Sequence, residues 1–87
     1  MEIPTTSGRK RSITERQAEL LRIISEWVEV RGYPPTLKEM ASRLGVKSDQ
    51  AVRELLMRLE GHGAIIRTPG ISRGIVLTDV GHRVVAS

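Results

Sequence analysis

The fold is decided by residues 36–59, which read TLKEMASRLGVKSDQAVRELLMRL. Thr36 and Glu39 have the spacing of a capping box, which starts a helix of about two turns. Gly45 can take the left-handed conformation that ends a helix, and Ser48 is an N-cap candidate for the next one. Two helices joined by only a few residues, with a glycine at the bend, are typical of a helix-turn-helix.

The second helix of this pair has one apolar and one polar face. Its predicted buried face carries Val52, Leu55, Leu56 and Leu59. Its outer face then carries Gln50, Arg53, Glu54, Met57 and Arg58. Amide, guanidinium and carboxylate side chains suit the edges of adenine, guanine and cytosine, respectively. We therefore expect Gln50, Arg53 and Glu54 to contact bases of duplex DNA and Met57 to fill the edge of the core, although on other helices such side chains are ordinary solvated surface.

A longer helix precedes this pair, and capping residues indicate where it begins and ends. Thr14 and Gln17 form another capping box, after which apolar residues recur at three- and four-residue steps. Gly32 can cap the end of this helix, and Pro34-Pro35 prevent its continuation. We therefore expect a first helix between Thr14 and Gly32.

The residue pattern changes after Gly63, near which the third helix is expected to end. Residues 64–67 and 74–77 are short β-rich runs, and Pro69-Gly70 between them predicts a turn. A hairpin directly after a helix-turn-helix is the wing of a winged helix. The expected fold is therefore α+β and mainly α: a three-helix winged helix-turn-helix with a C-terminal β-hairpin wing.

Composition limits the chain to one small domain, which we expect over residues 12–87. The 87 residues are too few for two cores, and they include no cysteine for disulfides or thiolate metal sites. No apolar stretch has the length of a membrane span or of the core of a signal peptide. Residues 78–85 are expected to add one or two helical turns, although Gly81 disfavours a helix.

The charge balance favours a polyanionic partner. Lysines and arginines exceed acidic residues, for a net charge of +4. Residues 1–11 have no apolar period and are expected to form a disordered basic tail. Within that tail, Arg9-Lys10-Arg11 fit a solvated segment and an arm that follows a phosphate backbone equally well.

Candidate phosphate contacts lie at two helix starts and in the wing. Lys47 and Ser48 precede the third helix, where free amides and the positive end of the helix dipole favour a phosphate. Thr36 has the same place on the second helix, and both hydroxyls also serve as caps. Arg58 on the outer face and Arg73 in the wing add cations, and Arg73 is otherwise a solubilising charge. We expect all five residues to contact the DNA backbone.

The sequence contains no residue pattern typical of an active site. His62 and His82 are twenty residues apart, without the spacing of a zinc site. No glycine-rich phosphate-binding motif is present, and nothing positions a Ser/His/Asp set. We expect no catalytic residues, no metal site and no cofactor.

Four short stretches occur together, in this order: ITERQ (13–17), RGYPPT (31–36), LGVKS (44–48) and SRGI (72–75). Together they cover the chain from about residue 13 to 77, and they resemble the DNA-binding domain of the LexA family of SOS-response repressors. The resemblance implies a winged helix-turn-helix that binds palindromic operators and blocks transcription. It implies that the wing near Ser72 and Arg73 lies close to the DNA backbone. The family's base-contacting positions correspond to Ser48, Gln50, Ala51, Arg53 and Glu54.

The sequence departs from the family pattern in two ways. LexA of enterobacteria has Asn and Glu where this chain has Gln50 and Arg53, which predicts a different operator. The family's self-cleaving Ser/Lys domain, which supplies dimerisation and the response to DNA damage, is missing, and the chain closes with apolar Val84 and Val85 in place of a polar linker. We therefore expect a stand-alone regulator in preference to a fragment of a longer repressor.

These observations together predict a sequence-specific regulator of transcription that binds double-stranded DNA. We expect it in the cytoplasm of a bacterium or as a phage protein, associated with the nucleoid. One short domain contacts one half-site weakly, so tight binding should require two copies on a palindromic operator, with a homodimer on DNA. The alternative is a winged-helix protein-interaction module within a nucleoprotein complex, against which Lys47, Gln50 and Arg53 argue.

Overall fold

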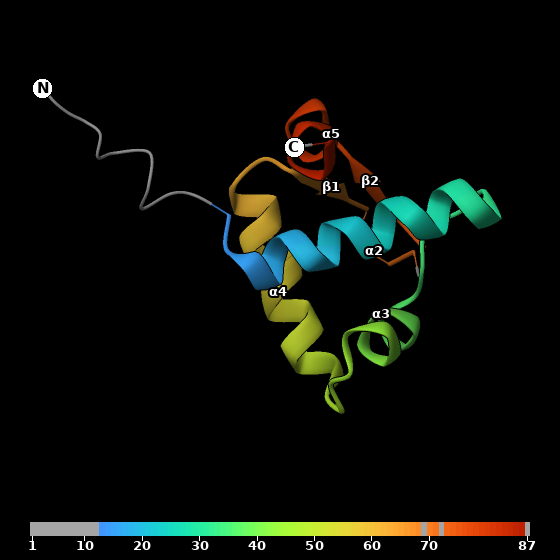
Figure 1. Ribbon diagram of the computed structural model, residues 1–87. Helices are drawn as coiled ribbons and strands as arrows, with labels where there is room; N and C mark the ends of the chain where they lie inside the picture. The colour runs from blue at the N-terminus through green and yellow to red at the C-terminus, as the bar shows by residue number, and fades with distance from the viewer. Residues whose placement is uncertain (1–12, 69, 72, 87) are drawn as a thin grey trace, which may run out of the picture.

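The computed structural model describes residues 13–68, 70–71 and 73–86. These residues form helices α2 (Glu15–Arg31), α3 (Leu37–Leu44), α4 (Asp49–Gly61) and α5 (Asp79–Ala86), and strands β1 (Ile65–Arg67) and β2 (Ile75–Leu77). The mainly helical arrangement with one small antiparallel sheet is that of a winged helix-turn-helix, as predicted (Figure 1). Among these residues, no helix is long and apolar enough to cross a membrane.

The capping signals act where the sequence predicts them. The Thr14 hydroxyl accepts a hydrogen bond from the Gln17 amide at 3.2 Å, and the Gln17 side chain accepts one from the Thr14 amide at 3.2 Å. Gly32, which ends α2, and Gly45, which ends α3, both have the left-handed backbone conformation, with φ of 82° and 78°. Because these residues satisfy otherwise unpaired backbone groups, they set the lengths of both helices.

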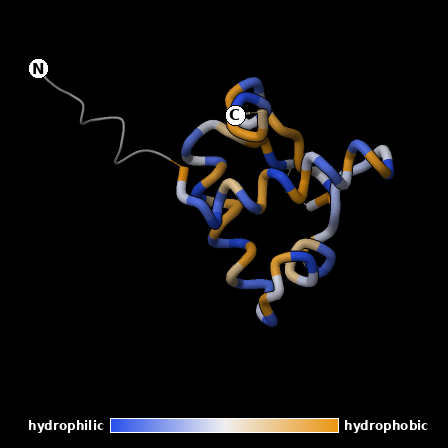
Figure 2. Tube along the Cα trace, in the orientation of Figure 1, coloured by the Kyte–Doolittle hydropathy of each residue, from blue (hydrophilic) through white to orange (hydrophobic). Residues whose placement is uncertain are grey.

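An aliphatic core joins the helix-turn-helix to the rest of the fold. Helix α2 contacts α3 and α4 on one side and α5 on the other (Figure 1). Polar and apolar residues alternate in short stretches along the helices, as the periodicity requires (Figure 2). The core residues of α2, α3 and α4 are Leu20, Leu21, Ile23, Ile24, Met40, Ala41, Leu44, Val52, Leu56 and Leu59.

The wing is a short hairpin with one buried face. Ile65 pairs with Leu77, and both side chains are buried. Ile66 pairs with Val76 on the opposite face, where the two side chains are 59% and 62% exposed. The alternation of side chains along a strand therefore anchors the wing to the core through one face only.

Helix α5 forms over Asp79–Ala86, in spite of the glycine that disfavours it. Gly81 is buried, and a methyl group at this position would overlap the carbonyl oxygen of Ala64. The Thr78 hydroxyl accepts a hydrogen bond from the Gly81 amide at 3.2 Å and so stabilises the first turn. Helix propensity alone is thus misleading at Gly81, because the missing side chain lets α5 approach the backbone of Ala64, just before β1.

Candidate nucleic-acid interface

The outer face of α4 carries a row of hydrogen-bonding side chains. Gln50, Arg53 and Glu54 are exposed, and they succeed one another along one side of the helix. Within the described part of the chain, these three side chains form no ion pair and no hydrogen bond with a protein group. Amide, guanidinium and carboxylate groups are therefore available together to a partner that approaches α4 from outside. We call these three residues the recognition stripe.

Other predicted contact residues of α4 surround the recognition stripe. Arg58 is exposed one helical turn further along, and Ala51 is half-buried beside Gln50. The prediction that Met57 fills the edge of the core is wrong, since its side chain is 62% exposed. Leu56 and Leu59 already face the core, and Met57 points away from both because successive side chains turn by about 100°.

The start of α4 combines a cap with an exposed cation. The Ser48 hydroxyl accepts a hydrogen bond from the Gln50 amide at 3.1 Å, so the residue acts as the N-cap. Lys47 and Ser48 are both exposed beside this helix end. The position suits a phosphate, since the positive end of the helix dipole and an ammonium group lie close together.

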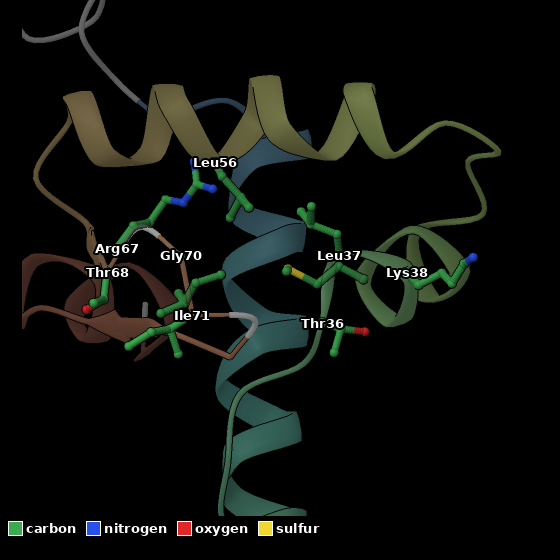
Figure 3. A pocket seen from close by; sticks show the side chains of 11 residues that line it. Thr36, Leu37, Lys38, Leu56, Arg67, Thr68, Gly70 and Ile71 are labelled. Atoms are coloured by element: carbon green, nitrogen blue, oxygen red, sulfur yellow. The ribbon is translucent and has the colours of Figure 1, made fainter.

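A groove separates the wing from the helix-turn-helix (Figure 3). Its volume is about 270 Å³, and it lies between the start of α3, the middle of α4 and the turn of the hairpin. Leu37, Leu56 and Ile71 supply much of its apolar lining, and the Arg67 side chain extends from the wing toward α4. Thr36, at the rim, accepts a hydrogen bond from the Glu39 amide at 3.2 Å and thus caps α3.

Arg73 lies in the turn of the wing, but its guanidinium group is directed into the protein. It forms an ion pair with Glu39 at 3.0 Å and donates a hydrogen bond to the Pro34 carbonyl oxygen at 2.8 Å. From the sequence, Glu39 is recognisable only as part of a capping box, because no local pattern links residues 34 positions apart. Ser72, the other predicted backbone contact in the wing, lies outside the described residues, as do Arg9-Lys10-Arg11 and the rest of the predicted tail.

The Glu39 carboxylate is held in its charged form. The hydrogen bond from the Thr36 amide and the guanidinium of Arg73 keep the pKa of Glu39 below its ordinary value. A carboxyl group with a lowered pKa adds stability that is complete above its ordinary pKa and is lost as the pH falls through the lowered value.

Glu39→Gln should therefore flatten the acid side of the stability profile. The substitution removes the titrating group, so the free energy of unfolding should fall less from neutral to acid pH in the variant than in the parent. Urea denaturation at a series of pH values measures this difference. An equally steep fall in both proteins would show that Glu39 does not contribute to the acid sensitivity.

Comparisons with known proteins agree with this geometry. The family model of the LexA DNA-binding domain matches residues 10–74. The chain is 52% identical to the LexA repressor of Pseudomonas chlororaphis over 63 residues, which are 72% of this chain and 31% of the relative. It is 48% identical to the LexA repressor of Hahella chejuensis over 65 residues, or 75% of this chain and 32% of the relative.

These matches thus span about a third of the length of the curated relatives. The matched region runs from before α2 through the helix-turn-helix and β1 to the end of the wing turn, and it includes the whole recognition stripe. The chain belongs to the LexA DNA-binding domain family.

Proposed function

We propose that this domain binds double-stranded DNA sequence-specifically and regulates transcription, with α4 in the major groove. The recognition stripe carries the proposal, because three side chains suited to base edges share one exposed face of the second helix of a helix-turn-helix. The matched relatives are named repressors, which supports repression by occupation of an operator. A protein with this proposed function would be located in the bacterial nucleoid, because its ligand is chromosomal DNA.

The proposed contacts divide into two groups. Gln50, Arg53 and Glu54 hydrogen-bond to base edges, while Ser48 and Ala51 approach the bases from the start of the same helix. The DNA backbone is contacted by Thr36, Lys47, Arg58 and the wing around Ser72. Backbone contacts set the position of the domain on the duplex, and base contacts distinguish one sequence from another.

Selection of binding sites from a randomised pool of duplexes tests the proposal directly. We expect an enriched half-site that is repeated with two-fold symmetry, because two copies of one domain on an operator share its symmetry. A palindromic consensus would support a homodimer on DNA. Enrichment of no sequence, together with no shift of random duplex at low salt, would favour a protein-interaction module.

Affinity for the selected duplex should fall steeply as salt concentration rises. Each phosphate neutralised by the protein releases counterions, so the logarithm of the binding constant should fall by about 0.9 per phosphate for each tenfold rise in salt. Fluorescence anisotropy with a labelled duplex at several salt concentrations measures the slope. A flat response would contradict phosphate contacts by Lys47 and Arg58.

A further inference from the structure

The guanidinium group of Arg73 joins the wing to the start of α3. Its two terminal nitrogens lie 3.0 and 3.3 Å from the two carboxylate oxygens of Glu39. One of these nitrogens also donates to the Pro34 carbonyl oxygen, and the guanidinium carbon lies 4.5 Å from the centre of the Tyr33 ring. We call Arg73 with these three partners the wing clamp. It connects segments that lie 34 or more positions apart in the sequence.

The wing clamp needs the shape of an arginine. A planar guanidinium group can face both carboxylate oxygens, donate to a carbonyl and stack on a ring at the same time, whereas a lysine ammonium group cannot. The Arg73 and Glu39 side chains are 36% and 33% exposed, so water only partly competes with their contacts. The contacts of Arg73 therefore restrict its side-chain conformation more than an ordinary surface ion pair would.

These contacts also make Arg73 a poor phosphate ligand. The carboxylate of Glu39 neutralises the guanidinium, and a phosphate would have to displace it. Glu39 in turn accepts a hydrogen bond from the Thr36 amide at 2.8 Å, so moving it would disturb the cap of α3. The charged groups of Arg73 and Glu39 thus stabilise the fold. They hold Arg73 of the wing beside α3, the helix that leads into α4.

We propose that Arg73 is a positioning residue, which sets the wing turn at the start of α3 and thereby aligns the backbone contacts of the wing with those of the helix-turn-helix. This inference rests on the proposed DNA binding for its effect on affinity. The alignment itself exists without DNA. Loss of the wing clamp should therefore loosen the turn in the free protein and weaken binding to every sequence alike.

Three substitutions separate positioning from phosphate contact. Glu39→Gln keeps an oxygen for the capping box but removes the charge that holds Arg73. Arg73→Lys keeps the positive charge but removes the planar group. Glu26→Gln is the matched control, because Glu26 is exposed and forms a similar ion pair with Arg43 at 3.1 Å, away from the wing. Both glutamate variants change the net charge equally.

Amide hydrogen exchange without DNA provides the first measurement. We expect exchange of the Thr68 amide, which donates to the Gly74 carbonyl oxygen at 2.8 Å, to become about fivefold faster in Glu39→Gln and Arg73→Lys. Exchange should not change in Glu26→Gln. Because loss of the wing clamp also lowers the free energy of unfolding, the amide of buried Leu56 should exchange faster only by the factor that urea denaturation gives. An opening free energy at Thr68 that stays below that at Leu56 distinguishes local loosening from global unfolding. Unchanged exchange at Thr68 would overturn the proposal.

Affinity for duplex DNA provides the second measurement. Glu39→Gln and Arg73→Lys should each bind selected and random duplex about fivefold more weakly than Glu26→Gln, with an unchanged salt slope, and the double variant no more weakly than either. Tighter binding by Glu39→Gln than by Glu26→Gln, or full affinity in Arg73→Lys, would overturn the proposal and assign Arg73 to a phosphate. If the parent binds no duplex, the DNA-binding function fails, while hydrogen exchange still decides the wing clamp.

Discussion

Arg53→Ala should lower affinity for the selected operator by about 5- to 150-fold, the loss expected for one bidentate base contact of about 1–3 kcal/mol. Affinity for random duplex should fall much less, because there the side chain supplies only part of the electrostatic attraction. Stability should not change, since Arg53 is exposed and has no ion-pair partner in the described part of the chain. Competition titrations with operator and random duplex measure both affinities.

Arg58→Ala is the matched control for this experiment. Arg58 lies on the same helix, is also exposed and carries the same charge, but we assign it to a phosphate. Its loss should weaken binding to all sequences alike and reduce the salt slope by about 0.9. The reverse pattern, in which Arg58→Ala relaxes base preference and Arg53→Ala does not, would mean that α4 enters the groove with a different face.

Gly81→Ala should destabilise the protein by about 1–3 kcal/mol, the usual cost of adding atoms to a packed site. Within most helices the same change is stabilising, because alanine has the higher helix propensity. Here the added methyl group would overlap the Ala64 carbonyl oxygen, which already accepts a hydrogen bond from the Thr78 amide at 3.0 Å. Backbone atoms cannot move aside as a flexible side chain can, so α5 must shift.

Fluorescence of the single tryptophan reports this loss during urea denaturation. Trp27 is 8% exposed in the folded protein, and unfolding would bring it into water. Gly61→Ala is the control, because a methyl group at Gly61 would meet no atom within 4 Å. That variant should be as stable as the parent or slightly more stable. Equal stability of the two variants would contradict the close approach of α5.

Local signals predicted the helices well. Each of the first three has its cap at the expected residue, because Thr14, Thr36 and Ser48 bond to amides only two or three positions away. The short strands followed from β-rich runs on either side of a turn. Hydrophobic periodicity likewise identified the buried and exposed faces of α4, apart from Met57, whose apolar character suggested a core position that the helix phase does not allow.

Features that depend on distant residues could not be predicted in this way. A capping glutamate has the same local pattern whether or not an arginine 34 positions later binds it, so the role of Glu39 in the wing clamp has no signature in the sequence. The structural role of Gly81 has no local sequence signature either, because it depends on the close approach of the Ala64 backbone. The roles of individual side chains on DNA stay predictions until binding is measured.

On α4, the side chains that pack in the core differ from those that we propose contact bases. Substitutions at Gln50, Arg53 and Glu54 remove no side-chain hydrogen bond or ion pair within the described part of the chain, so they need no compensating change in the core. Specificity can therefore diverge rapidly among descendants of one gene while stability is conserved. The same independence makes the domain a suitable scaffold for engineering: a library randomised at these three positions should yield folded variants that bind new operators.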